Sequence, residues 1–258
     1  MNEDQVATVA LRERIAESVE MFHRRNAAPL PVEAGSRTSE DDTVLLPYNL
    51  SHSVTGAIAS ALDHFLALDA LVRTPPLPMA APYTLMRAGL ENAALAIWLL
   101  NPAEQHERVI RCLLLQIDDA ADSNGAREAA GFPHPKSFSE RRSEIVSHAR
   151  QHGVPTERLM GARPGWRSKI VDVGAVSGLG GPELEATWRW LSGYTHGRRW
   201  VHLTFGRREQ VLEDADGNRQ LRISASLPAL ASAAIQAGAL LDLAHELETK
   251  ARLTTTGR

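Results

Sequence analysis

The residues best suited to chemistry lie in the segment 188–200, which reads WRWLSGYTHGRRW. Arg189 and His196 are seven residues apart, so on a helix they return to nearly the same face after two turns. A guanidinium beside an imidazole can bind a phosphodiester and transfer a proton. These two groups are sufficient for metal-free cleavage of RNA at a ribose 2′-hydroxyl. We therefore predict Arg189 and His196 as a catalytic pair.

A second group of polar residues lies on two expected helices, an apolar one at 83–100 and its neighbour at 103–123. Arg87 and Glu91 are four residues apart on the first helix, where a buried charge needs a partner. The short connection between the helices predicts antiparallel neighbours, which would bring Arg87 and Glu91 against the second helix. The expected polar cluster consists of Arg87, Glu91, Arg111, Asp118 and Asp122. It is interpreted either as a salt-bridge lock between helices or as the floor of a polar pocket.

The segment 118–122 spells Asp-Asp-x-x-Asp, the pattern that holds magnesium and diphosphate in isoprenoid synthases. Carboxylates at i and i+4 face one way, and oxygen ligands suit magnesium. Asp118 and Asp122 are therefore alternative metal ligands, with magnesium as the alternative cofactor. The acidic run at 213–216 falls in an expected hairpin turn and supplies no second motif. The preferred hypothesis needs no metal and no cofactor.

Two of these segments resemble the HEPN superfamily of helical proteins. Arg189 and His196 enclose six residues, and the segment 192–197 (SGYTHG) is similar to the ending of abortive-infection-like members. The segment 87–94 resembles the "R, three residues, E" helix of uncharacterised members. The resemblance implies a helical bundle, homodimerisation and, in some members, ribonuclease activity by Arg189 and His196. Trp190 stands where the nuclease members carry Asn, Asp or His, and other members bind without catalysis.

Composition narrows the class of protein. The 258 residues are 43% hydrophobic and 23% charged, which is typical of a soluble globular chain. One cysteine, Cys112, excludes an internal disulfide framework. No apolar run is long enough to predict a membrane span, and the N-terminal segment lacks the basic start of a signal peptide. We therefore expect a cytoplasmic protein. The segment 136–208 contains 13 Lys and Arg and 6 Asp and Glu, so it is basic, although the formal net charge of the whole chain is −3.

The hydrophobic pattern predicts an all-α helical bundle with one β-hairpin in the C-terminal half, built as a single domain over 1–258. The helix at 83–100 is apolar on nearly every side, so we expect it at the centre. Pro and Gly at 26–48 predict a loop or linker. Alternating apolar residues around Asp216-Gly217-Asn218 predict a hairpin insertion at 200–226.

The sequence therefore favours a HEPN-like protein that binds or cleaves RNA, as a metal-independent endoribonuclease in a toxin or defence role. The partners implied are RNA, a second copy of the chain in a homodimer, and an antitoxin; no membrane is expected. One alternative is a small-molecule enzyme, with a diphosphate or isoprenoid substrate in the polar cluster. The other alternative is an interaction module without catalysis.

Overall fold

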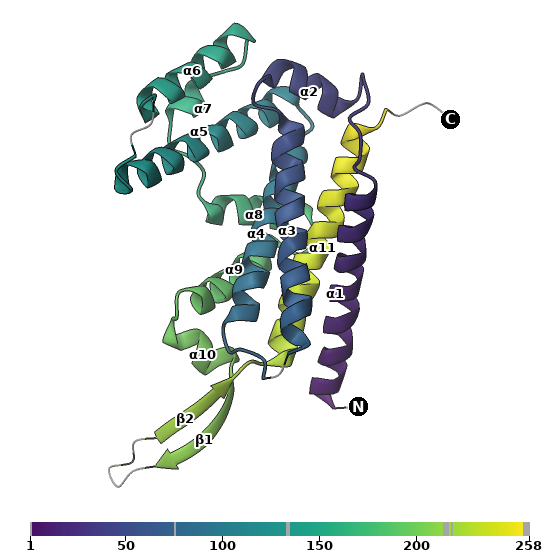
Figure 1. The fold of residues 1–258 in the computed structure, drawn as a ribbon, viewed down its shortest axis with the longest axis vertical. Helices are drawn as coiled ribbons and strands as arrows, with labels where there is room; N and C mark the ends of the chain where they lie inside the picture. Colours follow the sequence, from purple (N-terminus) through teal and green to yellow (C-terminus); the bar gives the residue numbers. More distant parts are fainter. Residues whose placement is uncertain (1, 75, 133–134, 214–216, 218, 255–258) are drawn as a thin grey trace.

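The computed structural model describes residues 2–74, 76–132, 135–213, 217 and 219–254, which form eleven helices and two strands (Figure 1). The first part of the chain contains α1 (Glu3–Ala27), α2 (Arg37–Leu45), α3 (Leu50–Val72), α4 (Ala81–Leu100) and α5 (Gln105–Ala129). The second part contains α6 (Phe138–Gln151), α7 (Glu157–Met160), α8 (Trp166–Val176), α9 (Gly181–Thr195), α10 (Arg199–Phe205), β1 (Arg207–Glu213), β2 (Arg219–Ser224) and α11 (Leu227–Arg252). The predicted all-α bundle with one hairpin is confirmed.

Local sequence signals set where several helices begin. In α1 the side chain of Asn2 accepts from the backbone amide of Gln5, and the side chain of Gln5 accepts from the backbone amide of Asn2. Ser137 and Glu140 form the same reciprocal cap at the start of α6. Helices α4, α9 and α11 carry a proline in the first turn, where a missing amide hydrogen costs no helical bond. These signals fix the first turns of the five helices.

Helix α4 lies at the centre of the bundle. It packs along α3 and α11, and α8 and α9 cover more of its surface (Figure 1). Helix α1 lies outside α3 and α11. Most side chains of α4 are buried, which removes a large apolar area from water and stabilises the fold in proportion to that area.

Helices α3 and α11 are long and apolar enough to cross a membrane by length and composition alone. The core helices of a folded bundle meet the same criterion. Each of the two buries a long face, and both pack against α4. Their apolar composition is what a position beside α4 requires.

The path of α5 corrects the prediction that it runs back along α4. Helix α5 diverges from α4 and packs against α6 and α7 at one end of the bundle, while α3 occupies the position beside α4 (Figure 1). The reason lies at the start of α5, where Arg108 binds Asp41 of α2 and the carbonyl oxygens of Pro102 and Ala103. These bonds direct α5 toward α2.

The loop predicted at 26–48 contains helix α2. Ser36 caps this helix by accepting from the amide of Ser39. Asp41 and Leu45 lie on the buried face of the helix. A helix of nine residues is too short to be stable by itself, so its tertiary contacts decide its formation. The sequence of α2 is mostly polar and shows no apolar residues at helical spacing, so no helix was predicted there.

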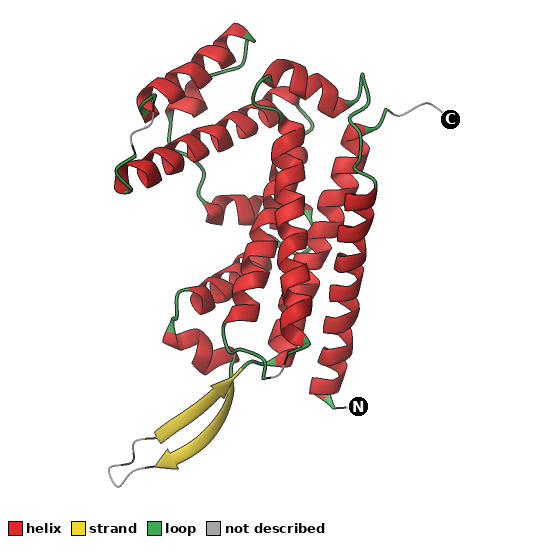
Figure 2. Ribbon diagram, viewed as in Figure 1, coloured by secondary structure: helices red, strands yellow, loops and turns green. Residues whose placement is uncertain are grey.

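The hairpin insertion predicted at 200–226 begins later than expected. Residues 199–205 form α10, because Val201 and Phe205 pack inward on α9. Strands β1 and β2 then pair antiparallel, with an irregularity between Gln210 and Leu212 (Figure 2). The predicted turn residues Asp216 and Asn218 lie outside the described residues.

A buried ion pair joins α2 to α5. The Nε and Nη2 atoms of Arg108 donate to the two carboxylate oxygens of Asp41, at 2.6 and 2.9 Å. The two side chains are 3% and 1% exposed. Because the geometry is bidentate and the remaining guanidinium nitrogen donates to backbone carbonyls, the charges are fully compensated.

We predict that Arg108→Ala and Asp41→Ala will each lower the free energy of unfolding by roughly 3–5 kcal/mol, since each leaves the other charge buried and unpaired. The matched control is Arg73→Ala. Arg73 binds Asp69 with the same two nitrogens, but its side chain is 74% exposed, so the loss should stay below about 1 kcal/mol. Equal losses in urea denaturation at the two sites would contradict the account of the Asp41–Arg108 pair.

Candidate nucleic-acid interface on α9 and α10

Helix α9 has an aromatic inner face. Trp190 is buried and its ring lies 5.9 Å from Tyr83, 6.2 Å from Tyr194 and 5.1 Å from Phe205. Tyr83 in turn stacks on Tyr194 at 4.0 Å. This cluster fixes how α9 is rotated on α4. It also shows that the residue after Arg189 serves packing, so it does not orient the predicted pair.

The end of α9 positions His196. The amide of Gly197 donates to Tyr194 and the amide of Arg198 donates to Gly193, which is a Schellman motif. Gly197 has φ +61°, the left-handed conformation that this motif needs and that favours glycine. A Cβ atom at Gly193 would lie 2.3 Å from a methyl carbon of Val201, so the glycine allows α10 to pack closely against α9. His196 is the exposed cap between these contacts.

Arg189 lies on the outer face of α9, with 55% of its side chain exposed. Its guanidinium binds Glu185 one turn earlier, at 2.7 Å, and Glu185 also binds Arg167 at 2.7 Å. Hydrogen bonds from Arg167 and Arg189 hold the pKa of the Glu185 carboxyl below its usual value. Because Arg167 alone can compensate Glu185, Arg189 can exchange its partner at the surface.

Basic side chains continue from α9 through α10 into β1. The segment 186–208 contains five arginines and no Asp or Glu. Trp200 is 49% exposed in the same stretch. We name this surface the basic edge; it consists of Arg189, His196, Arg198, Arg199, Trp200, Arg207 and Arg208, all exposed. Helices α9 and α10 and the hairpin lie at the end of the molecule away from α5, α6 and α7 (Figure 1).

The predicted polar cluster is divided between two places. Arg87 and Glu91 pair with each other at 3.0 Å, with 20% and 13% of their side chains exposed. Glu91 also accepts from the indole nitrogen of Trp188 at 2.7 Å. The pair therefore joins α4 to α9, and neither residue contacts Arg111 or Asp118 as the antiparallel register predicted.

The second place lies where α5 meets α8. Arg111 donates to the backbone oxygen of Trp98 at 2.7 Å, and its guanidinium lies 4.8 Å from the Trp98 ring. Asp118 binds Arg163 at 2.9 Å and the buried Lys169 at 3.5 Å. Lys169 lies over the Trp98 ring. Asp118 thus serves as the counter-ion of a buried lysine.

The three carboxylates of the Asp-Asp-x-x-Asp segment, the alternative magnesium site, have different surroundings. Asp118 already holds two cations, and Asp122 is exposed one turn later. Burial, together with Asp118 and Asp122, raises the pKa of Asp119 above its usual value. Across the described ranges, no three His, Cys, Asp or Glu side chains come together as a metal site.

A buried carboxylate on α11 was not among the predicted site residues. Glu248 binds Arg25 of α1 at 2.5 Å and Arg252 at 3.0 Å, and its side chain is 1% exposed. The spacing of Glu248 and Arg252 is i, i+4 within an Ala- and Leu-rich helix. This is the same signal that indicated Arg87 and Glu91, so it was available in the sequence.

We predict that Glu91→Ala will lower the free energy of unfolding more than Arg87→Ala. Loss of Glu91 leaves both Arg87 and the indole nitrogen of Trp188 without a partner, whereas loss of Arg87 leaves Glu91 bonded to Trp188. For Glu91→Ala we expect about 2–3 kcal/mol, less than the 3–5 kcal/mol of fully buried pairs because both side chains are partly exposed. Thermal melting of the two variants tests the order, and a larger loss for Arg87→Ala would refute it.

We predict that Asp118→Asn will destabilise the protein by roughly 1–3 kcal/mol, because Lys169 loses its counter-ion. Asp122→Asn is the matched control and should change stability by less than about 0.5 kcal/mol. Magnesium with inorganic diphosphate should leave the melting temperature of the wild type unchanged. A rise in melting temperature that Asp122→Asn abolishes would instead support the metal site.

The basic edge can neutralise phosphates and offer one exposed aromatic ring for stacking, and it carries an exposed guanidinium on α9 and an exposed imidazole at the C-cap of that helix. The Arg87–Glu91 pair and the Asp118–Lys169 pair hold helices together. Comparison with protein-family models, with curated proteins and with solved structures finds no match for this chain.

Proposed function

We propose that the protein binds RNA along the basic edge and cleaves it with Arg189 and His196, without a metal ion. The observation that carries this proposal is the run of exposed basic side chains from α9 to β1, uninterrupted by any acidic residue over 186–208. The HEPN-like motifs of the same segment support it.

Charge and shape favour a polyanion as the partner of this edge. Each arginine that neutralises a phosphate releases condensed counterions, which makes binding strong and sensitive to salt. Trp200 adds an exposed ring on which an unpaired base can stack. Exposed aromatic and basic groups together are typical of single-stranded nucleic-acid binding.

The pair can act on one phosphodiester. Seven residues of helix span roughly 10 Å, which an arginine side chain and an imidazole can bridge around a phosphate. In the proposed step, His196 takes the proton of the ribose 2′-hydroxyl, and the 2′-oxygen attacks phosphorus as the bond to the 5′-oxygen breaks. Arg189 stabilises the charge that grows on the phosphate oxygens. A solvent proton completes the 5′-hydroxyl.

Binding without cleavage is the second candidate function, and Trp190 is the observation that favours it. Its indole belongs to the buried aromatic cluster, so the position after Arg189 supplies no polar group to the pair. The toxin or defence role, the homodimer and the antitoxin partner implied by the HEPN resemblance remain part of the proposal in both cases.

The test incubates the purified full chain with a structured RNA in the presence of EDTA. We predict cleavage by the wild type, and a loss of about 100-fold or more in rate for Arg189→Ala and for His196→Ala. Because the two groups stabilise one transition state, the double variant should be scarcely slower than either single variant. Arg12→Ala, which removes an exposed arginine of α1, is the control and should cleave normally.

Binding is measured in parallel over a range of salt concentrations. Removal of both Arg198 and Arg199 should weaken binding and flatten its salt dependence. Intact RNA with salt-sensitive binding would select the binding function alone. Intact RNA without such binding, or binding indifferent to Arg198 and Arg199, would refute the proposal.

A further inference from the structure

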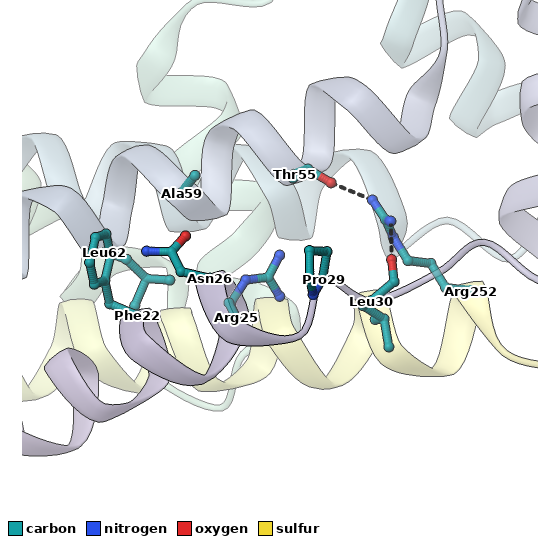
Figure 3. A pocket seen from close by; sticks show the side chains of 9 residues that line it. All are labelled: Phe22, Arg25, Asn26, Pro29, Leu30, Thr55, Ala59, Leu62 and Arg252. Carbon is teal, nitrogen blue, oxygen red and sulfur yellow. Dashed lines mark hydrogen bonds between the residues drawn. The ribbon is translucent and has the colours of Figure 1, made fainter.

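A cavity of about 230 Å³ lies between the end of α1, the first half of α3 and the end of α11 (Figure 3). Phe22, Leu62 and Ala59 form its apolar wall. Arg25 and Arg252 also line it, with Asn26 beside Arg25 on α1. An apolar wall opposite a few fixed polar groups is the usual composition of a small-molecule site.

Two arginines and one buried carboxylate meet at the polar wall. Two guanidiniums, Arg25 and Arg252, flank the single buried carboxylate of Glu248, which also accepts from the hydroxyl of Thr55 at 3.3 Å. His245 contacts Arg25 at 2.9 Å, and burial together with Arg25 lowers the pKa of His245. Burial and the neighbouring guanidinium thus disfavour a second positive charge on the imidazole.

The guanidinium of Arg25 has a free binding edge among the described residues. The Nη1 atom of Arg25 holds Glu248 and His245, but no described residue accepts from its Nε or Nη2 atom. These two nitrogens form the edge with which Arg108 binds Asp41 in bidentate geometry. Arg252, by contrast, uses both terminal nitrogens on Leu30, Ser51, Thr55 and Glu248.

We propose that this cavity binds a small monocarboxylate that carries a compact aromatic or branched apolar group. The carboxylate pairs with the free edge of Arg25, and Asn26 donates a further hydrogen bond. The apolar group fills the space against Phe22 and Leu62. An apolar cavity of roughly 150 Å³ holds benzene, so about 230 Å³ accommodates a ligand the size of phenylacetate.

The experiment titrates the full chain with sodium phenylacetate by calorimetry and follows the melting temperature. We predict saturable binding and a rise in melting temperature with ligand concentration. Phenylacetamide has the same shape without the charge and should bind about tenfold more weakly or worse. Inorganic phosphate has the charge without the apolar group and should also bind at least about tenfold more weakly.

Two variants test whether the ligand binds in this cavity. Arg25→Lys keeps the charge near Glu248 but removes the bidentate edge, and Ala59→Phe fills the apolar wall from α3. Each should weaken phenylacetate by about tenfold or more, while Arg24→Lys, the neighbouring exposed arginine, should leave it unchanged.

Three results would overturn the proposal. The first is an absence of saturable phenylacetate binding by the wild type at concentrations up to about 10 mM. The second is affinity unaffected by both variants in folded protein. The third is inorganic phosphate binding as tightly as phenylacetate, which would assign the site to phosphate alone.

Discussion

The burial of α4 is the constraint on which the rest of the structure depends. This helix is apolar on nearly every side, so it must be covered on nearly every side. Helices α3, α11, α8 and α9 provide that cover. The aromatic face of α9, centred on Trp190, packs inward for the same reason, and it thereby turns Arg189 outward. The basic edge is thus a consequence of how the core is closed.

The buried carboxylates fix which helices meet. Asp41 joins α2 to α5 and Glu248 joins α11 to α1, each through an arginine, and Glu91 joins α4 to α9 through the indole of Trp188. Apolar packing is tolerant of small shifts between helices, whereas a buried charge without its partner is costly. Such pairs therefore favour one arrangement of the bundle. Of these three carboxylates, Glu248 alone binds two arginines of the described chain, Arg25 and Arg252, and these two arginines line the cavity proposed to bind a carboxylate.

Much of this fold could be predicted from the sequence, because helix starts and apolar faces are local properties. The apolar run at 83–100 and the short connection to the next expected helix at 103–123 indicated α4 and α5. The direction of α5 could not be predicted, since it depends on the contact between Arg108 and Asp41, 67 residues apart. For the site, the sequence alone gives the spacing of Arg189 and His196. The inward position of Trp190 could not be predicted, because it depends on how α9 packs on α4.

The central claim is that RNA lies along the basic edge, and ultraviolet cross-linking of the full chain to a uniformly labelled RNA tests it most directly. After digestion, mass spectrometry identifies the peptides that carry nucleotide. The account predicts cross-links in the segment 189–208, with Trp200 the most reactive side chain. Cross-links confined to α5, α6 and α7 would contradict it. So would a Trp200→Ala variant whose yield of cross-links in the segment 189–208 equals that of the wild type.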